Sequence, residues 1–126
     1  MKIVRSADIE IIPASHEDIE SPRVFKKIIL QMADIIDGRI QMINWAFLPV
    51  GKSFRGHYHE DMQEIFILIK GEAQIFVNNE QAELCEGDTV VVPVGSVHRM
   101  ENIGKNDIEY IVIGVAKGTR GRTIIV

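Results

Sequence analysis

The segment GKSFRGHYHEDMQE, residues 51–64, holds two of the chain's four histidines within three positions. Side chains two positions apart on a β-strand point to the same face, so His57 and His59 can both point into one interior. Glu64 follows a short turn-like stretch and begins the apolar run EIFILI. A His-x-His pair also fits a solvated loop or two partly buried histidines, so the rest of the chain must decide between a loop and half of a metal site.

Composition narrows the class of protein. The chain has 126 residues, enough for one domain, and it is 46% hydrophobic and 25% charged, as ordinary globular proteins are. A net charge of −4 and a pI near 5.5 disfavour nucleic acid or an anionic membrane as the main partner. The single cysteine, Cys85, allows no internal disulfide, and no secretory signal or membrane-spanning apolar run is visible. We therefore expect a cytoplasmic protein.

Short β-branched and aromatic runs, separated by Gly, Asn, Asp or Pro, predict an all-β fold, a sandwich or barrel. The expected strands cover residues 25–32, 40–48, 63–70, 73–77, 89–92, 98–101, 109–116 and 123–126. Residues 1–22 are expected to form an N-terminal arm with an edge strand near residues 10–12, and residues 23–126 a single barrel domain. A single helical turn is compatible with residues 14–18. The pairs Asp37-Gly38 and Asn78-Asn79 suit tight hairpin turns.

Several expected strands are apolar on both faces, and Ile65, Ile67 and Ile69 alternate with Phe66 and Leu68. A strand that is buried on one side only should alternate with polar residues. The outer face must therefore be covered by the arm, by a second sheet or by another subunit. We favour a homodimer.

A second patterned segment, GDTVVVPVGSVHRMEN, spans residues 87–102. In the first segment and the seven residues after it, five, one, four and six residues separate Gly51, His57, His59, Glu64 and Gly71. In the second, the separations are five, one, two and three residues between Gly87, Pro93, Gly95, His98 and Asn102. Both segments resemble the two signature motifs of the cupin family, and together with the stretch between them they cover residues 51–102.

The resemblance implies an antiparallel jelly-roll β-barrel, the cupin double-stranded β-helix. It also implies that His57, His59, Glu64 and His98 bind one divalent transition metal ion, Fe, Mn, Ni or Zn. Imidazole and carboxylate suit such ions, and a six-coordinate ion held by these four residues keeps two adjacent positions open. Structural zinc sites, in contrast, are closed and usually rich in cysteine. Gly51, Gly71, Gly87 and Gly95 are expected at tight turns, and Pro93 and Asn102 as supports of a bend and a turn.

Strand alternation extends the list of inward side chains. We expect Met62, Phe66, Leu68, Met100, Ile75, Val77, Val91, Tyr110 and Val112 to point inward. On the strand of residues 40–48, either Met42, Asn44, Ala46 and Leu48 point inward, or Ile43, Trp45 and Phe47 do. The resulting pocket would be mostly apolar with a few polar groups, as small-molecule sites usually are.

Other residues near the motifs have simpler interpretations. The candidates for contact with a substrate are Arg55, Tyr58, Gln63, Asn44, Trp45 and Tyr110, although solvation or packing explains each of them as well. His16 is a lone histidine on the arm, for which we favour no metal role. Cys85 is expected to be a small core or hairpin residue. The basic stretch of residues 117–122 is expected to be a solvated loop rather than a phosphate site.

The reaction stays open at this point, because a shared fold and metal site do not fix the chemistry. The first hypothesis is a small metalloenzyme of the dioxygenase, isomerase, decarboxylase or lyase type. Its substrate would be a small oxygen-bearing molecule chelated to the metal, and Glu64 would be both a ligand and a base. The alternative is a non-catalytic module that binds or senses a metal or a small ligand. An acid or base near the open coordination positions of the metal ion would distinguish the enzyme from the binding module, and the sequence identifies no such residue unambiguously.

Overall fold

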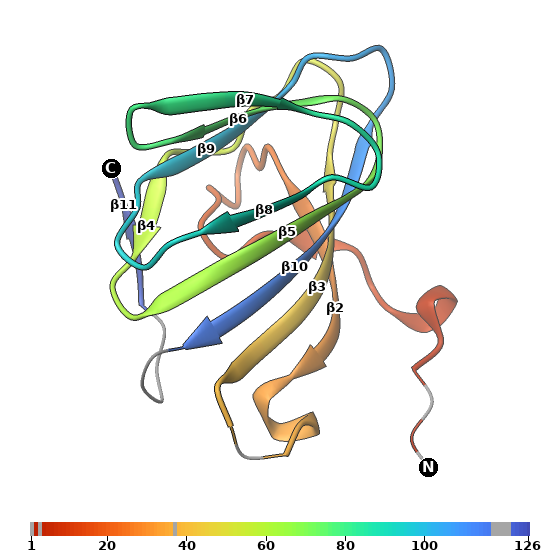
Figure 1. The fold of residues 1–126 in the computed structure, drawn as a ribbon. Coiled ribbons are helices and arrows are strands. Elements are labelled where there is room, and N and C mark those ends of the chain that lie inside the picture. The colour runs from red at the N-terminus through yellow and green to blue at the C-terminus, as the bar shows by residue number, and fades with distance from the viewer. Residues whose placement is uncertain (1, 3, 37, 117–121) are drawn as a thin grey trace.

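The structure, a computed structural model, describes residues 2, 4–36, 38–116 and 122–126. Two antiparallel sheets face each other across an interior (Figure 1). The six-stranded sheet has the order β1 (Ile12–Pro13), β2 (Phe25–Gln31), β3 (Ile40–Leu48), β10 (Ile108–Ala116), β5 (Met62–Lys70) and β8 (Thr89–Val92). The five-stranded sheet has the order β11 (Thr123–Ile125), β4 (His57–His59), β9 (His98–Asn102), β6 (Ala73–Val77) and β7 (Glu80–Leu84). This architecture confirms the predicted all-β, antiparallel jelly-roll barrel.

Only two short 3₁₀ turns, η1 (Ser6–Asp8) and η2 (Met32–Asp34), interrupt the strands within the described part of the chain. None of the described residues belongs to a helix long and apolar enough to cross a membrane. On the arm, β1 pairs with β2, close to the expected edge strand. The expected turn near residue 15 is present as a single hydrogen bond from the Glu17 amide to the Ala14 carbonyl, and it does not continue into a helix.

Alternation along β5 shows why this sequence forms a barrel wall. Met62, Glu64, Phe66 and Leu68 are buried, whereas Gln63 and the isoleucines between them are only half-buried on the outer face. Strand β10 follows the same pattern with Tyr110 and Val112. The interior is filled by apolar side chains from both sheets, and among the largest fully buried are Phe54, Leu48, Leu68, Met100 and Ile108. Most of the predicted inward residues are therefore confirmed.

The structure decides the open register of β3. Asn44, Ala46 and Leu48 are buried, and Met42 packs on the core, so this set points inward. The Trp45 indole lies on the outer face, where its Nε1 donates a hydrogen bond to the Glu109 carboxylate at 3.1 Å. The strand is fixed by its pairing with β10, in which Ala46 lies opposite Tyr110 and Asn44 lies opposite Val112.

One inward assignment is wrong. Val91 is 52% exposed, whereas Val92 is buried and Val90 packs against the core. Thr89 is the only polar residue in the run TVVV, and threonine occurs on either face of a strand, so the sequence signal for the register is weak. Pairing with β5 decides the register, because Val92 lies opposite Glu64 and Val90 lies opposite Phe66.

The turns have the backbone conformations that the motif glycines indicated. All four motif glycines have positive φ, namely Gly51, Gly71, Gly87 and Gly95, and Asn78 at the hairpin has φ 52°. The Asn102 side chain donates hydrogen bonds to two backbone carbonyls and accepts one from the Gly104 amide, which confirms its role in a turn. Cys85 is exposed in the turn after β7, so a core position for it is excluded. The basic stretch lies outside the described residues except for Arg122.

Candidate metal centre

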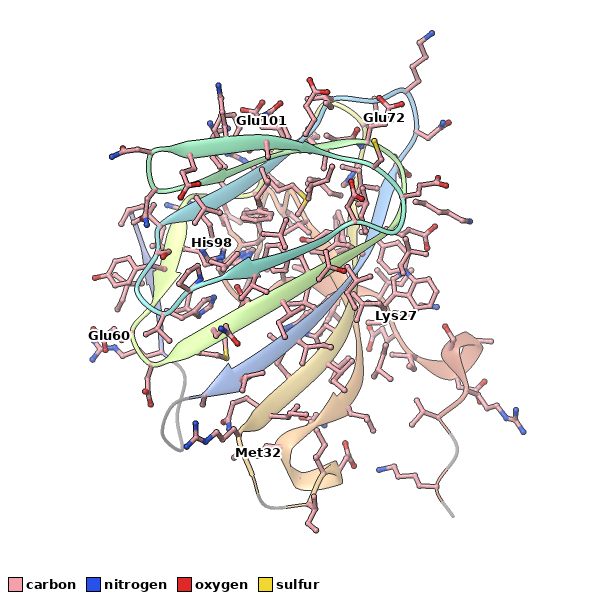
Figure 2. All side chains as sticks on the ribbon, in the orientation of Figure 1. Lys27, Met32, Glu60, Glu72, His98 and Glu101 are labelled. Carbon is pink, nitrogen blue, oxygen red and sulfur yellow. The ribbon has the colours of Figure 1, made fainter. Side chains whose placement is uncertain are left out.

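Four predicted ligands from three strands meet between the sheets. His57 and His59 lie on β4, His98 lies on β9 directly opposite His57, and Glu64 comes from β5 in the other sheet. One nitrogen or oxygen atom from each of the four residues lies within 4.8 Å of the others, and all four residues are buried. Figure 2 shows His98 between the sheets, whereas Lys27, Glu60, Glu72 and Glu101 project outward. The group fits a single metal site.

Each imidazole is held through its Nδ1 atom. His57 Nδ1 lies 2.7 Å from the Arg55 carbonyl oxygen, and His98 Nδ1 lies 2.9 Å from the Ser96 carbonyl oxygen. Because a carbonyl only accepts hydrogen bonds, both Nδ1 atoms must carry the proton. His59 Nδ1 lies 3.0 Å from the Thr123 hydroxyl. This support of one ring nitrogen orients the other for a metal ion.

The Nε2 atoms of His59 and His98 point toward the Glu64 carboxylate. Its Oε1 lies 2.7 Å from His59 Nε2 and 3.1 Å from His98 Nε2. A neutral His98 that donates through Nδ1 offers only a lone pair at Nε2, which faces an anionic oxygen. Such a convergence of acceptors is stable only with a cation among them, either a metal ion or protons.

The electrostatics of the group follow from burial and from these contacts. Burial, together with the neighbouring His16 and His98, lowers the pKa of His57 to about 3. Burial alone would raise the pKa of Glu64, but hydrogen bonds from protonated Nε2 atoms of His59 and His98, and their charge, outweigh it, so that pKa is lowered. His57 is therefore neutral and Glu64 ionised near neutral pH, the forms in which both residues bind metals.

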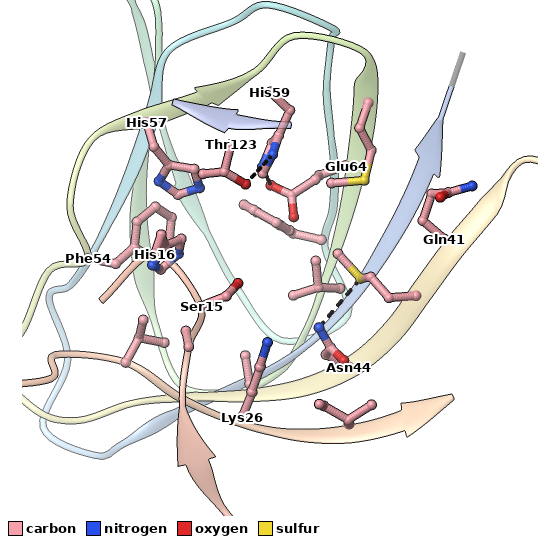
Figure 3. Close-up of a pocket in the computed structure, with 18 of the residues that line it drawn as sticks. Ser15, His16, Lys26, Gln41, Asn44, Phe54, His57, His59, Glu64 and Thr123 are labelled. Carbon is pink, nitrogen blue, oxygen red and sulfur yellow. Dashed lines mark hydrogen bonds and ion pairs between the residues drawn. The ribbon is translucent and has the colours of Figure 1, made fainter. Parts of the chain in front are cut away.

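Three of the four residues, His57, His59 and Glu64, line a cavity of about 420 Å³ (Figure 3). This volume falls within the range of roughly 300–1,000 Å³ that is typical of small-molecule sites. Its other walls come from β2, β3 and β10, from Phe54 and from the arm at residues 14–16. The cavity combines apolar side chains with a few polar groups, as predicted.

Four of the polar groups are notable because they face the same cavity as the candidate ligands. They are His16, Lys26, Asn44 and Tyr110. Burial lowers the pKa of His16 and of Lys26, and raises that of Tyr110. The His16 ring lies 4.2 Å from the His57 ring between centroids. Its Nδ1 is 3.5 Å from Glu17 Oε2, and Glu17 Oε1 accepts hydrogen bonds from the Arg23 and Val24 amides.

Of the six residues that the sequence suggested for contact with a substrate, two line the cavity. Asn44 and Tyr110 line the cavity, whereas Arg55, Tyr58, Gln63 and Trp45 do not. Sequence reasoning missed Lys26, Ser15 and Thr123 as cavity residues, and His16 was not expected beside the ligands. The one available signal was a lysine pair, Lys26-Lys27, at the start of an apolar strand, where one lysine must face inward by alternation.

The comparisons agree with this architecture. Residues 44–114 match the family model described as the cupin domain, which covers more than half of the chain. A relative in Methanocaldococcus jannaschii, an uncharacterized protein, is 34% identical over 56% of this chain and 57% of its own length. A protein of Thermotoga maritima named an oxalate-binding protein is 32% identical over 52% of this chain and 54% of its own length.

A solved structure of a predicted oxalate decarboxylase from Thermotoga maritima superposes with a TM-score of 0.79. It is 24% identical and covers 91% of this chain and 99% of that one, so the likeness shows a shared fold. The matched region spans little more than half the length of the two curated relatives. The two motifs, the jelly-roll barrel and the family match together establish that this chain belongs to the cupin family.

Proposed function

We propose that the chain binds one divalent transition metal ion, Fe, Mn, Ni or Zn, through His57, His59, Glu64 and His98. A small oxygen-bearing molecule in the cavity would bind to the same ion, and the protein would be a small metalloenzyme of the dioxygenase, isomerase, decarboxylase or lyase type. The observation that carries the proposal is the convergence of the His59 and His98 Nε2 atoms on Glu64 Oε1, with the Nδ1 protons of His57 and His98 committed to backbone carbonyls.

A bound ion would act as a Lewis acid on the oxygens of the bound molecule. The chain's own residues supply the rest of the site. Phe54, Phe66 and Val112 wall the cavity and limit the water that reaches the reacting atoms. Glu64 is the one acidic residue among the described residues that line the cavity, so it is the group placed to accept a proton, and we propose it as the catalytic residue.

A second candidate, a non-catalytic binding module, is favoured by one observation. The lowered pKa of Glu64 makes its carboxylate a weak base, which suits a ligand better than a proton acceptor. The relative named an oxalate-binding protein suggests a small carboxylate as the ligand of such a module. Oxalate is therefore the first molecule to test under both hypotheses.

The deciding experiment measures metal content by mass spectrometry on protein purified anaerobically without a polyhistidine tag. We expect about one metal ion per chain, and binding of oxalate by calorimetry that requires the ion. Consumption of oxalate or of related oxygen-bearing molecules would support the enzyme, and saturable binding without turnover would support the module. A chain that takes up no metal after incubation with Mn²⁺, Fe²⁺, Ni²⁺ and Zn²⁺ would refute both.

We also propose that the chain forms a homodimer through the outer face of the six-stranded sheet. Two neighbouring rows of outward side chains there are almost wholly apolar: Trp45, Ile111 and Ile67, then Ile43, Ile113, Ile65 and Val91. Light scattering at micromolar concentration should give a dimer mass, and Ile67→Glu in the first row should give a monomer. A monomeric wild-type protein would refute this assembly.

Two further proposals concern organisation and location. We propose that residues 1–22 form an arm on a single barrel domain of residues 23–126, because the arm adds only the two-residue edge strand β1 and part of a cavity wall, whereas the long strands of the barrel begin at β2. We also propose a cytoplasmic location, because the single cysteine is exposed and unpaired with another, which suits a reducing compartment.

A further inference from the structure

Lys26 on β2 projects into the cavity from the side opposite the candidate metal ligands. Figure 3 shows its ammonium directed inward, across the cavity from His57, His59 and Glu64. The residue is half-buried, and its ammonium makes no hydrogen bond or ion pair with any residue that the structure describes. A partly desolvated cation that interacts with the Glu64 carboxylate only across the cavity, and contacts no acid, is costly to keep, and an anion in the cavity would reduce that cost.

The strand register explains how Lys26 reaches this position. Lys26 lies opposite Ala46, and Ala46 lies opposite Tyr110 on the next strand. The small alanine between two long side chains leaves space above the sheet, and no acid occupies this row. The neighbouring Lys27, in contrast, does not line the cavity, and its ammonium donates to the Ser6 carbonyl at 3.0 Å and to the Ser6 hydroxyl at 3.2 Å.

Asn44 provides a second unsatisfied polar group in the same wall. Its Oδ1 is buried without a hydrogen-bond partner among the described residues, and its Nδ2 has only the Met42 sulfur at 3.5 Å. Asn44 lies on β3 two residues before Ala46, so its side chain points to the same face. Buried amide oxygens are rarely left unpaired, which indicates a ligand with a hydroxyl or another donor.

From this geometry we infer that Lys26 and Asn44 form an anion-binding subsite at the far side of the cavity from the metal group. The ligand is a small molecule with chelating oxygens at one end and a second anionic group at the other. Lys26 binds that anionic group, a carboxylate or a phosphate, and Asn44 Oδ1 accepts a hydrogen bond from a donor between the two ends. The statement that one end of the ligand chelates a metal ion rests on the proposed function. The statement that Lys26 and Asn44 form a subsite rests only on the side chains of this cavity wall.

Three probes share one chelating end, a 2-hydroxy acid, and differ at the other end. Lactate has no second anion, malate has a carboxylate, and 3-phosphoglycerate has a phosphate. Calorimetric titration of the zinc-loaded protein should give malate or 3-phosphoglycerate at least about tenfold tighter binding than lactate, because a hydrogen bond to a charged group contributes about that factor or more. The tighter of the two identifies the anion as carboxylate or phosphate.

The matched variants are Lys26→Gln and Lys27→Gln, which remove the same charge from adjacent positions on opposite faces of β2. Lys26→Gln should abolish the preference over lactate and leave lactate binding unchanged, whereas Lys27→Gln should keep the preference. A preference that survives in Lys26→Gln, or a wild-type protein that binds all three probes equally, would overturn the inference.

A second measurement separates this inference from the proposed function. In metal-free protein, saturating malate or 3-phosphoglycerate should shift the NMR signals of the Asn44 side-chain amide, and Lys26→Gln should remove that shift. A chain that takes up no metal but shows this shift would contradict the metalloenzyme and support the subsite. A chain that holds zinc but shows neither the shift nor the preference would refute the subsite alone.

Discussion

The substitution Thr123→Val tests whether the Thr123 hydroxyl orients the His59 imidazole for binding a metal ion. Thr123 Oγ1 lies 3.0 Å from His59 Nδ1, and with an ion on Nε2 the Nδ1 proton donates to this hydroxyl. Valine keeps the shape and the strand preference of threonine but leaves that proton without its partner. Loss of such a supporting contact typically lowers metal affinity about 10–100-fold. Because Thr123 is exposed, water can replace the hydroxyl, so we expect the lower end, about tenfold, or about 1.4 kcal/mol.

The assay is competition for zinc against a chromophoric chelator, with wild type and both variants at one pH. Thr89→Val is the control, because Thr89 is an exposed strand threonine on β8 that has no hydrogen bond with a candidate ligand among the described contacts and lies outside the cavity lining. Unfolding of the metal-free proteins should show that both variants fold. A zinc affinity of Thr123→Val within twofold of wild type would refute the inference that this hydroxyl supports His59.

Three further outcomes are expected. His59→Ala should remove most of the bound metal while circular dichroism shows an intact barrel, because the core is apolar; full metal occupancy by mass spectrometry would contradict the ligand assignment. The free energy of unfolding of the metal-free protein should fall as the pH drops from about 6.5 toward 3, because the unfolded chain binds a proton that His57 in the folded chain does not. A flat profile between pH 7 and 4 would contradict the lowered pKa. Gly114→Ala places a Cβ 2.7 Å from the Met62 sulfur, so we expect a cost of about 1 kcal/mol in denaturant unfolding and weaker binding of ligands, whereas unchanged values would contradict the close packing beside Glu64.

The strands that sequence alone located well are those whose chemistry alternates or is strongly apolar. The bounds of β3, β6 and β8 match the predicted residues. Strand β7 was missed, because four of its five residues, in EQAEL, are exposed and resemble a solvated loop. It is nevertheless a strand because it forms the edge of its sheet and pairs along its whole length with β6 through the turn at Asn78.

The registers show the same limit. The register of β5 followed from the predicted ligand, because an inward Glu64 places Met62, Phe66 and Leu68 on the same face. Strand β8 contains only threonine and valines, so its sequence is compatible with both faces, and Val91 was assigned inward wrongly. The register of β3 was open because its polar residues, Gln41 and Asn44, are three positions apart and fall on opposite faces by alternation, and the pairing of Asn44 with Val112 settled it.

The sequence by itself determined the family and the four candidate ligands, because motif spacing encodes where strands turn and which side chains share a face. It could not place Lys26 and Asn44 in one cavity wall or His16 against His57, because the residues of these pairs are 18 and 41 positions apart, and Lys26, Asn44 and His16 lie outside the motifs. Only the tertiary structure decided those placements, since they depend on how β2 pairs with β3 and how the arm lies on the barrel. The residues of the metal group can therefore be identified from the spacing within the two motifs. The cavity proposed to select the ligand depends instead on packing between segments that are far apart in the sequence.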